Sequence, residues 1–394
     1  MTGAAVKRNR ITEWWRPKAG AIFSLLLFYL AFWEVPFELG WKLLLFSTIT
    51  LSGFGVTGYF LNDWADIPYD RKARKTNLAD GIPLVLRFVL LLGLLVMALA
   101  PWVVYFESDR LCLGLISLQL LLQFIYPMPP VRVKNLPLAA IVVDALYAFV
   151  IPSLLAWHAF DVTAGYSLNN GYLHFVFLGL WMLAIGIRQI VNHHVIDSFN
   201  DKISDTPNVT NKYDAKTLRS FIERVVFPLE LTGGGAFFFT LHNGDSYLPL
   251  IAIALIIVFV LPTLKKKPPF FSVSFSGAHA DRFSSFYLGL LGLGALVFVD
   301  VRYSFVFLVF VLLFTDVLLH PIVNHLFSRV RYLPWKAASL SVNWSIYYLR
   351  KYLLRWSEER NYGVHYPDYL ARLEMQNRAK NGTVAVFNQN HSKY

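Results

Sequence analysis

Two stretches of the chain place carboxylates at four-residue steps, each at the end of a long apolar run. Both have the same pattern, a polar residue followed by two aspartates. They are Asn62, Asp66 and Asp70 in the first stretch and His193, Asp197 and Asp201 in the second. A carboxylate at the bilayer centre costs about 2.5–3.5 kcal/mol on insertion scales, so four of them beside apolar runs indicate a bound cation. Mg²⁺ fits, because it takes oxygen ligands and is usually held by one or two carboxylates together with substrate phosphates.

Steps of four residues place side chains on one face of a helix, so each stretch is expected to present its polar groups together. Pro68 lacks an N–H group and clashes with the preceding turn. The first helix is therefore predicted to kink or end there, with Asp70 on a loop that folds back. Carboxylates from two helices that face one cavity would repel one another and raise each other's pKa. A bound cation removes this repulsion between the carboxylates when an anionic partner also binds to the cation.

Basic residues beside both stretches favour a partner that carries phosphate. They follow the first stretch, follow the segment Tyr126-Pro127-Met128-Pro129-Pro130, or lie within the second stretch. They are Arg71, Lys72, Arg74 and Lys75; Arg132 and Lys134; and Lys202. The alternative for each is a residue that only directs membrane insertion, because cytoplasmic loops are enriched in positive charge.

Other polar residues fall inside apolar runs. Asp144 or Glu230 is expected to pair with Arg188, because removing one partner of a buried ion pair is strongly destabilising. If Arg188 instead faces the cavity, it would help to hold a diphosphate. His193 has two interpretations, a proton acceptor and a residue that makes a structural hydrogen bond.

The composition is that of a multi-pass membrane protein. The 394 residues are 56% hydrophobic and 15% charged, with a mean hydropathy of +0.47, whereas soluble domains are about 25% charged. The net charge of +11 does not indicate nucleic-acid binding, because Lys and Arg cluster beside apolar runs. The single cysteine, Cys112, excludes an intramolecular disulfide and is expected to be a small buried residue.

Apolar runs long enough to cross about 30 Å of hydrocarbon recur along the chain. They lie near residues 20–39, 43–62, 83–106, 111–126, 137–160, 172–196, 221–241, 247–264, 284–300 and 303–320. The last two are close together, so they are two spans or one span with a re-entrant segment. The sequence thus predicts an all-α, multi-pass transmembrane helical bundle of nine or ten spans.

The chain is expected to have three parts, a cytoplasmic N-terminal flank (1–19), the transmembrane bundle (20–325) and a cytoplasmic or interfacial tail (326–394). In the tail, residues 336–356 mix Trp, Tyr and Leu with Lys and Arg, which favours an amphipathic helix in the membrane interface. Residues 376–394 are polar and expected to be disordered.

The distribution of Lys and Arg predicts the orientation. The loops after the second, fourth, sixth and eighth runs, the N-terminal flank and the tail are rich in basic residues, whereas the opposite loops hold little beyond Lys42, Arg110 and Arg302. By the positive-inside rule, both termini and both acidic stretches then lie on the cytoplasmic side.

The two acidic stretches also indicate an internal repeat. Runs one to four and five to eight would form two four-helix pseudo-repeats, each with an acidic stretch that closes its second run. Repeated membrane halves place their site at the interface between the repeats.

Several motifs together resemble one family. Residues 62–70 fit Asn-x-x-x-Asp-x-x-x-Asp, the sixth run ends with Asp-x-x-x-Asp, and residues 127–134 read Pro-x-Pro-Pro-x-Arg-x-Lys after the fourth run. With Arg16-Pro17 before the first run, this combination resembles the UbiA superfamily of intramembrane prenyltransferases over about residues 14–265.

The resemblance implies a helical bundle around a central cavity that is open sideways to lipid. It implies that Mg²⁺ bridges the two acidic motifs to an isoprenoid diphosphate. The residues carried over as metal ligands are Asn62, Asp66, Asp70, Asp197 and Asp201, of which the four aspartates are also expected to be catalytic. The residues expected to bind the diphosphate are Asn62, Arg71, Lys75, Arg132, Lys134, Arg188, His193 and Lys202. The sequence departs from the usual pattern of this family in two places, in the segment 76–81 and in the added tenth run and tail. These differences leave the identity of the substrate open.

The expected function is that of a Mg²⁺-dependent integral membrane prenyltransferase of terpenoid biosynthesis. The metal and basic side chains would stabilise the negative charge on the leaving diphosphate, and aromatic walls would shield the allylic cation.

Alternatives are a terpene cyclase without an acceptor, phosphosugar transfer to a polyprenyl phosphate, and a cation-coupled transporter. The expected partners are an isoprenoid diphosphate, an unidentified acceptor and the lipid bilayer. The length of the prenyl chain and the oligomeric state stay open.

Overall fold

The computed structural model describes residues 18–72, 77–106, 109–165, 172–204, 209–242, 246–265 and 283–313. Apart from Leu313, these residues belong to one compact unit, Trp14–Leu312, and the chain's second unit comprises Met1–Glu13 and Leu313–Tyr394. Residues 1–17 of the predicted flank and the whole predicted tail, 326–394, lie outside the described residues.

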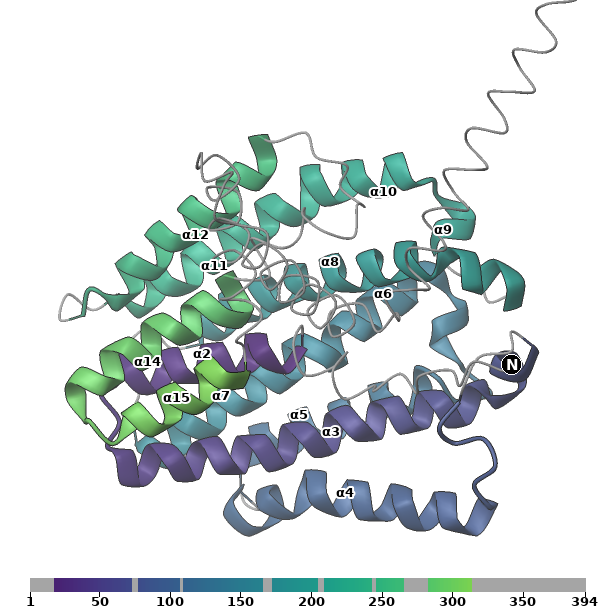
Figure 1. Ribbon diagram of the computed structural model, residues 1–394, viewed down its shortest axis with the longest axis horizontal. Coiled ribbons are helices and arrows are strands. Elements are labelled where there is room, and N and C mark those ends of the chain that lie inside the picture. The colour runs from purple at the N-terminus through teal and green to yellow at the C-terminus, as the bar shows by residue number, and fades with distance from the viewer. Residues whose placement is uncertain are drawn as a thin grey trace, which may run out of the picture. The chain divides into compact units, whose positions relative to one another are not determined.

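Every regular element in these described ranges is helical (Figure 1). The main helices are α2 (Gly20–Phe32), α3 (Phe37–Lys72), α4 (Leu84–Phe106), α5 (Arg110–Ile125), α6 (Pro137–Ala145), α7 (Ile151–Ala164), α8 (Leu173–Ser204), α11 (Phe227–Leu241), α12 (Leu248–Lys265), α14 (Leu288–Val299) and α15 (Tyr303–Leu313). Short elements connect or extend them: η2 (Val133–Asn135), η3 (Leu146–Val150), α9 (Val209–Lys212), α10 (Ala215–Phe221), η4 (Ile222–Val226) and η5 (Phe283–Tyr287). Each of the ten predicted apolar runs contains a helix, so the prediction of an all-α fold is confirmed.

Four helical segments are long and apolar enough to cross a membrane by length and composition. They are Phe37–Lys72, Leu84–Val103, Pro137–Ala164 and Leu173–Val195. Shorter apolar helices, such as α2, α5 and α15, occupy other predicted runs. Multiple apolar helices are what an integral membrane protein requires, because in lipid a helix satisfies its own backbone hydrogen bonds.

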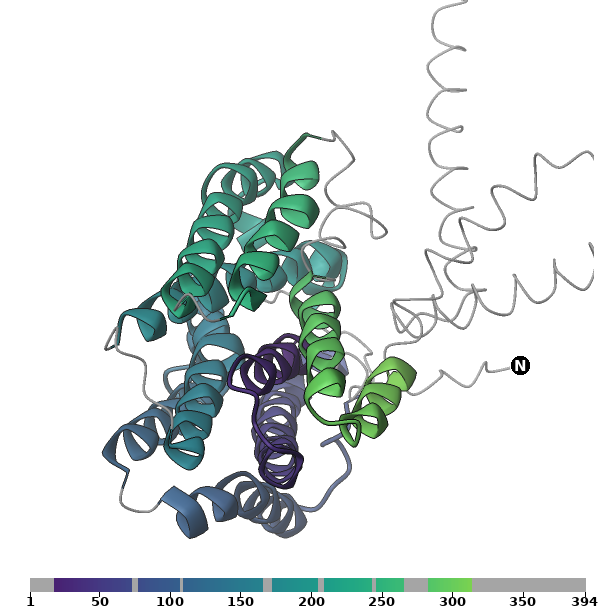
Figure 2. The same cartoon turned by 90° about the vertical axis from the view of Figure 1, so that its left-hand side faces the viewer.

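The first apolar helix, α2, lies in the interior, and all of its residues are buried. Helices α7 and α14 pack against it, as Figure 2 shows. The contact with α14 is close because Gly292 has no side chain. A Cβ atom there would lie only 2.6 Å from the carbonyl oxygen of Leu27 on α2.

Helix α3 continues through Pro68 to Lys72, with Asp70 inside the helix. The prediction that the helix could end at Pro68 and leave Asp70 on a loop is therefore wrong. Side chains from elsewhere reach the carbonyl groups around the proline turn: Asn77 donates to the oxygen of Asp63, and Arg132 donates to that of Ala65. Such contacts offset the lost backbone hydrogen bond, which is how membrane helices tolerate proline.

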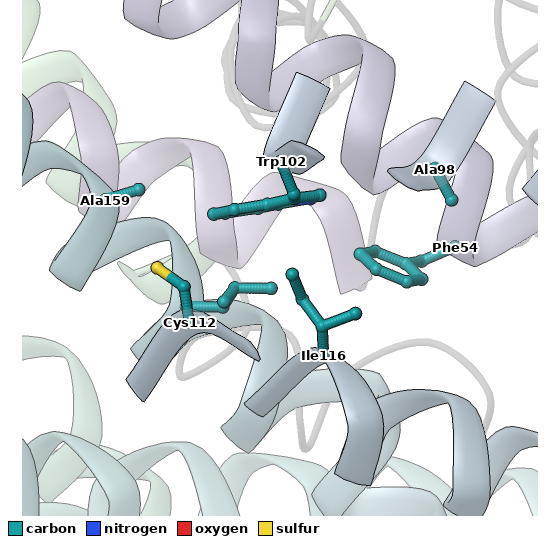
Figure 3. Close-up of a cluster of buried hydrophobic side chains, with 7 residues drawn as sticks. Phe54, Ala98, Trp102, Cys112, Ile116 and Ala159 are labelled. Atoms are coloured by element: carbon teal, nitrogen blue, oxygen red, sulfur yellow. The ribbon is translucent and has the colours of Figure 1, made fainter. Parts of the chain in front are cut away.

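A cluster of buried side chains joins α3, α4, α5 and α7 (Figure 3). Its members are Phe54, Ala98, Trp102, Cys112, Ile116, Leu155 and Ala159. Helices α3 and α4 approach closely here, since a Cβ atom on Gly53 would lie 2.6 Å from backbone atoms of Ala98. Cys112 is fully buried, which confirms the expectation for this residue.

Candidate functional site

The first acidic motif and the Pro-rich loop, residues 126–136, meet in the structure. The carboxylate of Asp66 accepts hydrogen bonds from Arg132 Nη2 at 2.7 Å and from Lys134 Nζ at 2.5 Å. Lys134 also donates to Asn62 Oδ1 at 3.0 Å. The structure thus joins four of the predicted site residues, from segments that are more than sixty residues apart in sequence.

The Pro-rich loop holds Arg132 in a defined orientation. The backbone of Arg132 is left-handed, with φ at 43°, a conformation that is rare outside glycine and concentrates at functional sites. The guanidinium group donates to Asn135 Oδ1 and to the carbonyl oxygen of Ala65, and it lies over the ring of Tyr69 at 4.2 Å. Because contacts surround the planar group, it is positioned for recognition of an anion by its fork of donors.

Asp70 is held by Asn77, a residue that lies outside the motifs found in the sequence. The Asn77 amide donates to Asp70 Oδ2 at 2.8 Å and to the carbonyl oxygen of Asp63 at 2.7 Å. Its own oxygen accepts from the backbone N–H groups of Ala79 and Asp80. The signal for this role was an Asn at the start of a turn, since Asn side chains commonly cap the backbone two residues ahead.

Arg71 points to the surface and not to Asp66. Its guanidinium group pairs with Asp80 at 2.6 Å, and 66% of its side chain is exposed. The hydrogen bond from Arg71 holds the pKa of the Asp80 carboxyl below its usual value. In this arrangement Arg71 closes the turn over residues 77–83, and its predicted contact with a diphosphate stays a prediction.

The ion pairs at Asp66 are largely shielded from water. The exposed side-chain fractions are 14% for Asp66, 8% for Arg132 and 12% for Lys134. Burial lowers the pKa of the Lys134 ammonium, and the nearby Asp66 carboxylate opposes that shift. Low local polarity strengthens each charge interaction. A ligand that carries both a metal ion and phosphate groups would interact there with a carboxylate and with two cations.

Arg188 pairs with Glu230, one of the two partners that were expected. Two hydrogen bonds join its guanidinium group to the Glu230 carboxylate, at 2.8 and 2.9 Å, and both side chains are buried. Asp144 has other partners, Lys18 at 3.6 Å and the hydroxyl group of Tyr147 at 2.6 Å. The pair ties α8 to α11, and a contact of Arg188 with a diphosphate stays a prediction.

The second acidic motif lies in the C-terminal part of α8, which extends to Ser204. His193 is exposed there, with its ring 6.4 Å from that of His194. The side chains of Asp197, Asp201 and Lys202 lie outside the described residues, as does Lys75. The approach of the second motif to the first therefore stays a prediction.

Comparisons with known proteins support the family to which the motifs point. Residues 21–269 match the UbiA prenyltransferase family. Comparison with curated proteins gives no match. A similar solved structure is that of a UbiA homolog from Archaeoglobus fulgidus bound to GPP and Mg²⁺, with a TM-score of 0.50 and 14% identity over 73% of this chain and 98% of that chain. At this identity the likeness shows the helical fold.

Proposed function

Because this chain belongs to the UbiA prenyltransferase family, we propose that it is a Mg²⁺-dependent membrane enzyme that transfers an isoprenoid group from a prenyl diphosphate to a small or lipid-like acceptor. The observation that carries the proposal is the contact of Asp66 with both Arg132 and Lys134. This contact places two cations beside a carboxylate in a shielded site, which suits a metal-bound diphosphate better than a bare metal ion.

The described residues of the first motif fit Mg²⁺. Asn62, Asp66 and Asp70 offer an amide oxygen and two carboxylates on successive turns of α3, and Mg²⁺ prefers such oxygen ligands. In the proposal Asp197 and Asp201 supply the remaining carboxylates from α8. The bound ion would neutralise charge on the diphosphate as it leaves.

Arg132 and Lys134 hold the diphosphate in this proposal. Their charged donors already point at Asp66, so a phosphate oxygen near that carboxylate lies within reach of both. Cleavage of the bond between carbon and oxygen puts negative charge on the leaving group, and fixed cations stabilise that charge most in the transition state. Further contacts with the diphosphate are proposed for Arg71, Lys75, Arg188, His193 and Lys202.

The surrounding bundle has two functions in the proposal. The apolar helices form nine or ten spans around a cavity that is open to lipid, eight of them in two four-helix pseudo-repeats, with the site at its cytoplasmic mouth. The walls of the cavity take up the isoprenoid chain and exclude water from the allylic cation, and aromatic ring faces attract that cation by about 0.5–2 kcal/mol each. An electron-rich acceptor then forms the new carbon bond.

Incubation of the purified protein with Mg²⁺ and a panel of prenyl diphosphates, with and without candidate acceptors, tests the proposal. Mass spectrometry of the products and a diphosphate assay report the outcome. A prenylated acceptor that is absent in excess chelator is the expected result. Products that form without an acceptor would favour a terpene cyclase, and diphosphate release that persists in excess chelator would contradict the metal-dependent mechanism.

A further inference from the structure

A second group of metal-binding residue types lies at the end of α5 remote from the Pro-rich loop. Asp109 caps the N-terminus of α5, Cys112 lies in its first turn, and His158 belongs to α7. A carboxylate oxygen, the thiol sulfur and an imidazole nitrogen of these residues all lie within 4.8 Å of one another. A helix of this length rises about 24 Å, so the group is separate from the site around Asp66.

The contacts of this group already bring two of its ligand atoms together. Asp109 Oδ1 accepts a hydrogen bond from the backbone N–H of Cys112 at 2.8 Å, and Asp109 Oδ2 lies 3.0 Å from His158 Nε2. Cys112 is fully buried, whereas the side chains of Asp109 and His158 are 21% and 16% exposed. The carboxylate and the imidazole are thus partly exposed, and the buried sulfur lies within 4.8 Å of a ligand atom of each.

The two helices that carry these residues are packed firmly. Cys112 and Ile116 of α5 lie in the same buried cluster as Leu155 and Ala159 of α7, the neighbours of His158 along that helix. Figure 3 shows the sulfur atom of Cys112 on the side of Ala159. Packed supporting residues hold metal ligands near their binding geometry, which lowers the cost of ordering them when the ion binds.

We propose that Asp109, Cys112 and His158 bind one divalent transition-metal ion of the zinc class. On binding, the S–H bond of Cys112 breaks, a sulfur–metal bond forms, and the proton leaves to solvent. The thiolate and the carboxylate then balance the charge of the ion, so the complex is neutral, as a buried site surrounded by apolar side chains requires. A thiolate favours zinc-class ions over Mg²⁺.

The geometry needs only a small adjustment to become tetrahedral. Zn²⁺ bonds of about 2.0–2.3 Å place neighbouring ligand atoms about 3.3–3.6 Å apart. The separation of Asp109 Oδ2 and His158 Nε2, 3.0 Å, is slightly shorter than that, and the limit of 4.8 Å for the group is within reach of side-chain rotation. Three protein ligands leave a fourth position of the tetrahedron open for water or another small ligand.

Titration of the full-length protein in detergent with Co²⁺ alone, after removal of metals by a chelator, tests this proposal. We expect about one equivalent of Co²⁺ to produce the near-ultraviolet absorption of a cobalt–thiolate bond, and Zn²⁺ to remove it by displacement. Cys112 is the only cysteine of the chain, so this band reports that residue. Co²⁺ at the acidic motifs would have oxygen ligands and no such band.

Two variants and a control define the ligands. Cys112→Ser should abolish the band, His158→Gln should weaken Co²⁺ binding at least about tenfold, and Asp66→Asn should leave the band unchanged. Size-exclusion profiles and circular dichroism check that each variant is folded. Absence of the band in the wild-type protein, or an unchanged band in His158→Gln, would overturn the proposal, and the wild-type titration decides alone if a variant does not fold.

Discussion

At the scale of single residues, the site depends on polar groups that hold one another in place. Asp66 accepts from both cations of the Pro-rich loop, and Asn77 links Asp70 to the turn that follows α3. Asp66 thus accepts from two charged side chains, and Asp70 accepts from the neutral amide of Asn77. Substitutions at the two supports are therefore expected to have different effects on binding and on turnover.

Replacement of either proposed metal-bridging aspartate should remove activity without unfolding the protein. Asp66→Asn and Asp197→Asn each delete a charged oxygen ligand, so we expect the rate of diphosphate release to fall at least about 100-fold. Both variants should still insert and purify normally. Glu38→Gln, an exposed change at the other end of α3, is the control, and full activity in Asp66→Asn would contradict the metal-bridging role.

Asn77 is expected to act as a positioning residue for Asp70. Asn77→Ala removes hydrogen bonds to both Asp70 and the turn, so we expect about 1–2 kcal/mol lower stability and an apparent Mg²⁺ requirement raised about tenfold. Thermal unfolding and activity against Mg²⁺ concentration measure the two effects. Leu78→Ala, a change at an exposed neighbour, should alter neither. Loss of stability with an unchanged Mg²⁺ requirement would show a structural role only.

At the scale of helices, close approach between backbones sets the arrangement of the bundle. Gly292 allows α14 to contact α2, and Gly53 allows α3 to contact α4. Association of helices in lipid relies on such packing, because the membrane provides no hydrophobic driving force between apolar helices. The turn of α3 at Pro68 also depends on neighbouring segments, because Asn77 and Arg132 donate hydrogen bonds to its carbonyl groups.

Two glycines of α14 provide a matched test of this packing. A Cβ atom at Gly292 would clash with the backbone of α2, whereas at Gly294 it would meet nothing within 4 Å. We expect Gly292→Ala to lower the free energy of unfolding by about 1–3 kcal/mol, and Gly294→Ala to be neutral or slightly stabilising. Thermal unfolding in detergent measures both. Equal stability of the two variants would contradict the close packing of α2 and α14.

At the scale of the whole molecule, the two ends of α3 lie near loops that the positive-inside rule assigns to opposite sides of the membrane. Near its N-terminus, Glu38 pairs with Arg302 in the connection between α14 and α15. Asp66, near its other end, lies about 42 Å further along the helix axis. Arg132 and Lys134, in a loop predicted to be cytoplasmic, pair with Asp66 and therefore lie at the opposite end of α3 from Arg302.

Labelling of single cysteines tests this orientation. In a Cys112→Ala background, Val301→Cys should react with a membrane-impermeant maleimide in intact cells, and Leu78→Cys should react only after permeabilisation. Both positions are exposed, by 73% and 56%, so each serves as the accessibility control for the other. The reverse pattern would place the mouth of the site on the outer side and contradict the topology that the basic loops predict.

The sequence by itself determined where helices form and which polar groups share a helix face. Apolar runs of membrane-spanning length must be helical, because lipid offers no partner for backbone groups, and the spacing of Asn62 and Asp66 is a local property of one helix. Only the tertiary structure decided that α3 continues past Pro68, that Glu230 is the partner of Arg188, and that Asn77 holds Asp70. These outcomes depend on side chains that meet through packing between elements, and the spacing of residues along one helix carries no information about those distances.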